Sequence, residues 1–156
     1  MSTMEIILND HNKQEFPPAH TAEHILNQTM VRMFGCSRSR VNHIERKKSK
    51  CNYDLPACPT EKQIREVEVA VNAIIAADME VTVRYVTRAE VPESIDLSKL
   101  PEDASETLRL VYVGDYDVCP CLGAHVKRTS EIGHFRISST NYNEGNFRIV
   151  FRVAAQ

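Results

Sequence analysis

The sequence has no apolar run approaching the roughly 18 residues of a membrane-spanning helix. Its residues 1–12 lack the basic start and apolar stretch of a secretory signal. It also has no internal repeat, no low-complexity segment and no Gly/Ser-rich linker. From these absences we expect a cytoplasmic protein without a membrane-bound segment, folded as a single domain over residues 1–156.

The chain carries almost no net charge and an odd number of cysteines. A formal charge of −2 argues against a protein that binds nucleic acid non-specifically through its overall charge. It does not exclude a local basic patch. The five cysteines occur without an export signal, which favours free thiols or metal ligands over a disulfide framework. Hydrophobic residues at 42% and charged residues at 26% are typical of a globular protein.

Two helices are predicted by their boundary residues and by apolar spacings of three and four. Two prolines precede residues 19–34 and Gly35 follows them, as expected at the two ends of a helix. Thr60 and Gln63 have the spacing of a capping box before a second apolar stripe that ends near Asp78.

Strands are predicted in the rest of the chain. Alternation with a period of two predicts a half-buried strand over 79–85, followed by a short capped turn at 87–93 and a loop at 92–101. Further strand and hairpin segments are expected at 41–53, 108–113, 135–138 and 147–153. Helices and strands do not alternate regularly, so the fold class is α+β, a mainly antiparallel sheet packed with two principal helices.

Two pairs of possible metal ligands share one spacing. His20 and His24 lie four residues apart and on one face of the first helix, where their imidazoles can bind one metal ion. Cys121 and His125 repeat this spacing in a glycine-containing segment after a strand, so a bend is expected there. Both pairs occur together by chance in only about one chain in 25. The alternatives are a surface histidine and a cysteine packed as a small hydrophobe.

The residues around both pairs resemble a known family. His-Thr-Ala-Glu-His-Ile-Leu at 20–26 resembles the His-Thr-Ala-x-His-Leu-Leu motif of alanyl-tRNA synthetase editing domains, and Cys-Leu-Gly-Ala-His-Val at 121–126 resembles their Cys-Gly-Gly-Thr-His-Val. Residues 129–137 are similar to the family's Thr-Gly-Glu-Ile-Gly-x-Phe-x-Ile stretch. The resemblance is collinear over about 10–153, and indicates the threonyl/alanyl-tRNA synthetase second additional domain, an editing domain.

The resemblance implies a hydrolase that cleaves the ester between a wrong amino acid and the tRNA 3′ end, without ATP, in the service of translation fidelity. It assigns His20, His24, Cys121 and His125 as metal ligands and catalytic site, and neutral imidazoles with a thiolate suit Zn²⁺. Such an ion could polarise the ester carbonyl or lower the pKa of a water. Because the chain is too short for a synthetase core as well, we expect a stand-alone trans-editing protein.

The sequence departs from the family pattern in three places. Leu122 replaces one of the paired glycines and Ala124 replaces the motif threonine. The family's Phe-Asp-Phe segment has no clear copy, and residues 52–55 are the nearest match. Since all four ligand positions are kept, these departures bear on substrate choice more than on metal binding.

Other candidate groups are weaker. Glu23 follows three residues after His20 and lies about 100° round the helix from His24, which predicts a solvated side chain. Cys119 is a competing ligand beside Cys121, but the family spacing selects Cys121 and leaves Cys119 as a core residue or a neighbour of the ligands. The three remaining histidines have no partner at a diagnostic spacing and are expected at the surface: His11, His43 and His134.

A basic segment follows the first helix. Such runs are usually solvated, but next to an editing motif this one is a candidate contact for the phosphates of the tRNA acceptor end. Its cations are Arg38, Arg40, Arg46, Lys47, Lys48 and Lys50.

Several functions stay open at this point. The favoured substrate is serine, or glycine, on alanine tRNA, and serine on threonine tRNA is the alternative. A non-catalytic zinc-containing domain that binds RNA or another partner is a second class, and a zinc hydrolase of other small esters or amides is a third. A homodimer is conceivable, although no heptad pattern or apolar patch indicates one.

Overall fold

The computed structural model describes residues 16–39, 41–91 and 107–154. The predicted loop at 92–101 therefore lies outside the described residues. In chain order the elements are α2 (Pro17–Phe34), β1 (Val41–His43), β2 (Ser49–Asp54), α3 (Glu61–Ala76), β3 (Val81–Thr87), the 3₁₀ helix η1 (Arg88–Glu90), β4 (Thr107–Val113), β5 (Asp117–Pro120), the 3₁₀ helix η2 (Thr129–Ile132), β6 (His134–Asn143) and β7 (Asn146–Ala154).

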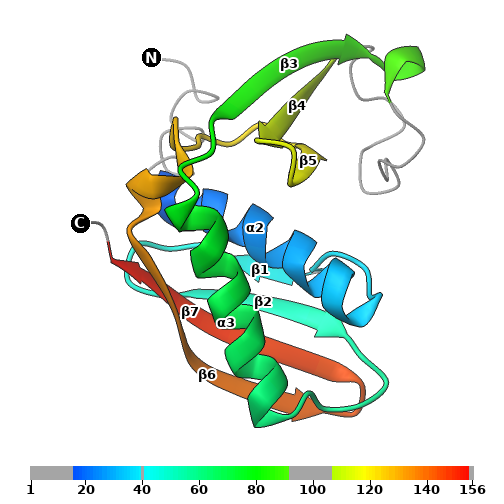
Figure 1. The fold of residues 1–156 in the computed structure, drawn as a ribbon. Helices are drawn as coiled ribbons and strands as arrows, with labels where there is room; N and C mark the ends of the chain where they lie inside the picture. The colour runs from blue at the N-terminus through cyan, green and yellow to red at the C-terminus, as the bar shows by residue number, and fades with distance from the viewer. Residues whose placement is uncertain (1–15, 40, 92–106, 155–156) are drawn as a thin grey trace, which may run out of the picture.

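The strands form two antiparallel sheets where the sequence suggested one. The larger sheet has the order β1-β2-β7-β6 and the smaller has the order β3-β4-β5. Helices α2 and α3 cover one face of the larger sheet, and the smaller sheet lies on the opposite side of α2 (Figure 1). The α+β prediction is confirmed, and α2 is the layer that the two sheets share.

Helix α2 has the boundaries that its proline and glycine residues predicted. It begins at Pro17 and ends at Phe34. Gly35 follows in the left-handed conformation with φ of 68°, and its N–H donates to Val31 O at 2.9 Å. Every residue from 21 to 27 is buried. A surface helix buries only a stripe, so burial all round agrees with a position between two sheets.

Helix α3 begins with the predicted capping box. The Gln63 N–H donates to Thr60 Oγ1 at 3.1 Å, and the Thr60 N–H donates to Gln63 Oε1 at 2.9 Å. The helix buries one face, which carries Val67, Val71 and Ile75. It ends at Ala76, slightly before the predicted end.

Turns and hairpins also agree with their sequence signals. Glu144 and Gly145 join β6 to β7 with φ of 46° and 86°, the left-handed pair of a two-residue hairpin. The segment 41–53 forms the hairpin β1–β2. The capped turn at 87–93 contains η1, where the Thr87 N–H donates to Glu90 Oε1 at 2.7 Å.

Strand β3 differs from its prediction in burial. Its sequence alternation predicted a half-buried strand, but both Val83 and Tyr85 are exposed, Tyr85 at 69%. Strand β3 lies at one edge of the smaller sheet and pairs only with β4 among the described strands, whereas β4 and β5 contact α2. The alternation therefore predicted the backbone conformation correctly and the environment wrongly.

The main core fills the space between the helices and the larger sheet. Its largest side chains come from both layers: Ile25, Leu26, Met30, Tyr53, Phe135, Phe147, Ile149 and Phe151. Within the described part of the chain, no helix combines the length and apolar character needed to cross a membrane.

Helix α3 offers a matched test of this packing. Val67 is 2% exposed and Val69 is 68% exposed on the same helix. Val67→Ala should lower the free energy of unfolding by about 2 kcal/mol, because it removes buried methyl groups and leaves a cavity. Val69→Ala should change it by less than about 0.5 kcal/mol. Urea unfolding followed by circular dichroism measures both, and equal effects would contradict the assigned faces of the helix.

Candidate metal centre

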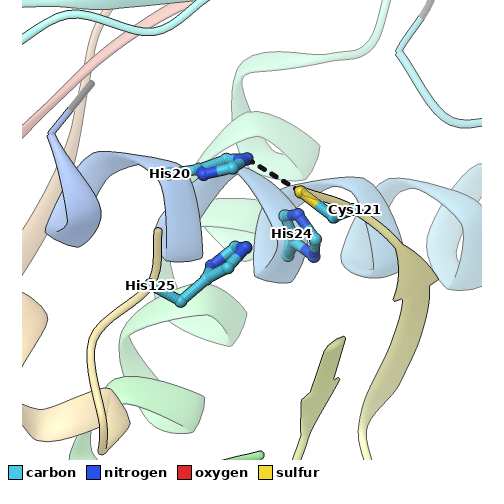
Figure 2. A group of neighbouring side chains, drawn as sticks. All are labelled: His20, His24, Cys121 and His125. Atoms are coloured by element: carbon cyan, nitrogen blue, oxygen red, sulfur yellow. Dashed lines mark hydrogen bonds between the residues drawn. The ribbon is translucent and has the colours of Figure 1, made fainter. Parts of the chain in front are cut away.

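The four predicted ligands meet between helix α2 and the segment after strand β5 (Figure 2). The ligand atoms of His20, His24, Cys121 and His125 all lie within 4.8 Å of one another. His20 Nε2 is 3.3 Å from Cys121 Sγ, and the His125 ring centroid is 4.2 Å from that of His20 and 4.4 Å from that of His24. Two sequence pairs thus form one group, and this group could hold a metal ion.

Two of the imidazoles are oriented through Nδ1. His20 Nδ1 lies 3.1 Å from Ala124 O and donates to it, so that Nε2 is left on the side of Cys121. His125 Nδ1 lies 2.9 Å from Thr21 Oγ1, which also accepts from the Val126 N–H at 3.2 Å. Contacts of this kind fix the ring and its tautomer in metal sites and leave the other nitrogen free for the ion.

The third imidazole faces a buried carboxylate. His24 Nδ1 is 3.7 Å from Asp117 Oδ2, which is an electrostatic contact rather than a hydrogen bond. Asp117 is held in turn by Arg38, at 2.6 Å and 3.2 Å to its two oxygens, and by Gln28 at 3.1 Å. Sequence analysis missed Asp117, because only the folded chain brings the start of β5 against helix α2.

The charges within the group suit a thiolate among imidazoles. Burial would raise the pKa of the Cys121 thiol, but its contacts with the three histidines outweigh burial and lower the pKa to about 3. Burial would lower the pKa of His24, yet contacts with Asp117 and Cys121 raise it to about 9. Burial lowers the pKa of His125 to about 4.

Two buried nitrogens of the group have no hydrogen-bond partner among the described residues, Nδ1 of His24 and Nε2 of His125. Buried polar atoms in proteins nearly always have one. The His125 ring points toward the other three side chains, where an ion would supply the missing partner of Nε2 (Figure 2). Three imidazoles and one thiolate match the donors that borderline-soft divalent metals prefer, so the residues fit a metal ion.

The bend that carries Cys121 is held by Arg109 of strand β4. One guanidinium nitrogen, Nη1, donates to Cys121 O and to Gly123 O, both at 2.8 Å, and the Cys121 N–H donates to Arg109 O at 3.1 Å. Residues 121–125 are not helical, as predicted. Sequence analysis missed Arg109, although an arginine inside the apolar strand Thr107–Val113 is a signal that could have been followed.

The burial of Glu23 differs from the sequence prediction. It was expected on a solvated face, but it is only 6% exposed. Its Oε1 lies 3.9 Å from His20 Nε2, and its Oε2 accepts a hydrogen bond from Asn27 Nδ2. The prediction was wrong because helix α2 has sheets on both sides and therefore little surface for a charged residue.

Cys119 and the remaining histidines lie outside the group. Cys119 is half-buried, and burial raises the pKa of its thiol to about 12, which favours the protonated form. His43 and His134 are exposed, as predicted, and His11 is outside the described residues.

The cations of the basic segment differ in their exposure and in their partners. Arg38 forms an ion pair with the buried Asp117. Arg40 lies outside the described residues, and Lys50 is half-buried in strand β2. The exposed cations stand in the β1–β2 loop: Arg46, Lys47 and Lys48. Arg46 packs over the Phe16 ring at 4.6 Å to its centroid, at the start of α2 and one turn before His20.

A helix and a bend that together bring three histidines and a cysteine into one group define a candidate metalloprotein of the α+β class. Comparison with known proteins is more specific, because residues 108–150 match the family described as "Threonyl and Alanyl tRNA synthetase second additional domain". These residues match that family, and the resemblance drawn from the motifs is confirmed.

Similar proteins extend the match to most of the chain. It is 30% identical to an alanine–tRNA ligase of Halorubrum lacusprofundi over 85% of its length, and 27% identical to that of Treponema denticola over 94%. The alanine–tRNA ligase of Bacillus subtilis is 28% identical over 91%. The aligned region is 15%, 24% and 16% of these relatives, so the chain matches a minor part of each.

Replacement of Arg109 tests how the bend supports the candidate metal ligands. Arg109→Met keeps the stem and removes the donors to Cys121 O and Gly123 O, so we expect metal affinity to fall about 10- to 100-fold. Competition with a chromogenic chelator measures this affinity. Arg65→Met, on the exposed face of α3, is the control and should leave it unchanged. If the Arg109 variant keeps the metal affinity of the original protein, Arg109 does not support metal binding.

Proposed function

We propose that this protein hydrolyses mischarged aminoacyl-tRNA, and that its first substrate is serine on alanine tRNA, with glycine on the same tRNA as the second. One observation carries the proposal: the histidines and cysteine of the family motifs converge to within 4.8 Å in a chain similar to alanine–tRNA ligases over most of its length. The family description also includes threonyl-tRNA synthetase, so serine on threonine tRNA is the alternative substrate.

The metal ion that fits this group best is zinc. His20, His24, Cys121 and His125 would hold it, since neutral imidazoles and a thiolate are ordinary zinc ligands. When bound, zinc supplies Lewis-acid polarisation of a carbonyl oxygen.

The chain's own residues supply positioning. The reaction adds water to the ester carbonyl carbon and breaks the bond to the ribose oxygen, which releases the amino acid and the tRNA 3′ hydroxyl. Arg109 fixes the bend at Cys121 and Gly123, while Thr21 and Ala124 O fix two of the imidazoles. Preset geometry of this kind lowers the barrier, because the groups need no rearrangement during the reaction.

A second candidate function is a metal-containing domain that binds RNA without cleaving the ester. It is favoured by the bend itself, where Leu122 is 88% exposed in place of a motif glycine and Ala124 replaces the motif threonine. Both changes lie beside ligands, where a family member is expected to contact its substrate.

Deacylation of charged tRNA tests the proposed function. The protein should release serine, but not alanine, from charged alanine tRNA, as measured by loss of acid-precipitable radiolabel. His20→Ala/His24→Ala should reduce the rate at least about 100-fold, because two of the four ligands are lost.

A variant of the two exposed histidines, His43→Ala/His134→Ala, is the matched control and should keep the original rate. Binding of RNA without release of serine would favour the second candidate function. Release of serine by both variants at equal rates would show that hydrolysis does not use the four-residue group.

The exposed cations of the β1–β2 loop test the contact with RNA. Replacing Arg46, Lys47 and Lys48 by Gln should weaken tRNA binding and reduce the slope of log K against log [salt] by about 2 to 3, because each phosphate contact contributes about 0.7 to 0.9. Filter binding at several salt concentrations measures the slope.

Lys62→Gln/Arg65→Gln removes exposed cations from α3 and should leave that slope nearly unchanged. If the loop variant keeps the original slope, the β1–β2 loop is not the surface that contacts phosphates.

A further inference from the structure

Helix α2 carries a charged residue between two candidate metal ligands that the chemistry above does not use. We propose that the Glu23 carboxylate binds the α-ammonium group of the aminoacyl ester, so that the site accepts esters of amino acids with a free amine. This inference rests on the proposed function and specifies which feature of the substrate the site recognises.

Of the two carboxylate oxygens of Glu23, only Oε2 has a hydrogen bond among the described residues. Oε2 accepts a hydrogen bond from Asn27 Nδ2. Asn27 Oδ1 accepts in turn from Tyr53 OH at 2.7 Å and from the Ser39 N–H at 3.2 Å. A glutamine could accept the same bond from Asn27 through its amide oxygen. The hydrogen-bond network therefore explains a polar residue at this position, but it does not explain a negative charge.

Among the described residues, no arginine or lysine forms an ion pair with the charge of Glu23. In the part of the chain that the structure describes, the one ion-pair partner within 4.0 Å is His20, through the 3.9 Å contact of Oε1 with Nε2. The other buried carboxylate of this region, Asp117, already has Arg38. A buried carboxylate without a cation is unfavourable. We expect a cation in direct contact with Oε1 to arrive with the substrate, in addition to the ion that the four-residue group would hold.

The position of Oε1 matches the shape of an aminoacyl ester. In such an ester the amine is two bonds from the carbonyl carbon, so an ester whose carbonyl lies at the four-residue group must place its ammonium within a few ångströms of that group. Glu23 Oε1 is 3.9 Å from a nitrogen of the group. A metal cation at the group would repel the ammonium, and the carboxylate beside it offsets this repulsion.

The experiment compares a free amine with a blocked one. Hydrolysis is measured on seryl-tRNA and N-acetyl-seryl-tRNA, and binding is measured by calorimetric titration with the amide of serine and 3′-amino-3′-deoxyadenosine and with its N-acetyl form. The protein should prefer the free amine about 10- to 100-fold in kcat/KM and in Kd, the usual strength of a charge-assisted hydrogen bond. Glu23→Gln should lose this preference, mainly through KM.

Controls separate this role from the others that Glu23 could have. Glu66→Gln, an exposed residue of α3, should keep the preference. The Glu23→Gln variant should keep the original zinc content and melting temperature, whereas a loss of zinc would make Glu23 a metal ligand and overturn the proposal.

The two measurements also separate this proposal from the proposed function. A preference in binding without hydrolysis refutes the proposed function and keeps the role of Glu23. Hydrolysis of both tRNAs at the same rate refutes the role of Glu23 and keeps the proposed function. Absence of both preference and hydrolysis refutes both.

Discussion

Burial of helix α2 between two sheets is the constraint on which the rest of the structure depends. The helix contacts β7 of the larger sheet on one side and β4 and β5 of the smaller sheet on the other. Water has little access to a helix in this position, and buried polar groups nearly always have hydrogen-bond partners. Several polar side chains of α2 therefore have partners from other elements, and the group around Cys121 is where a number of these contacts meet.

Two further polar residues of the helix, Thr29 and Arg32, also have hydrogen-bond partners. Thr29 Oγ1 donates to Ile25 O at 2.8 Å and lies 2.6 Å from Tyr116 OH, next to strand β5. Arg32 donates to Tyr116 O at 3.0 Å. These contacts align the start of β5 with the helix, so that the segment carrying Cys121 and His125 reaches the turn of α2 that carries the other two ligands.

Much of the fold and of the candidate site was predictable because the signals are local. The spacing of four residues places His20 and His24 on one face whatever surrounds the helix, and the capping box at Thr60 needs no other element. The position of Glu23, the partner of Asp117 and the exposure of strand β3 were not predictable, because each depends on which elements pack together across long stretches of sequence. The division of the strands into two sheets has the same origin.

The long separation between the two halves of the four-residue group has a consequence for the folding reaction. His20 and Cys121 are 101 residues apart in sequence and 3.3 Å apart in space. Closing a loop of that length costs chain entropy, and contacts of this range slow folding. The group therefore assembles only when the segment after β5 lies against helix α2, and an ion or substrate that needs all four side chains recognises this folded arrangement and no state in which the two parts are still separate.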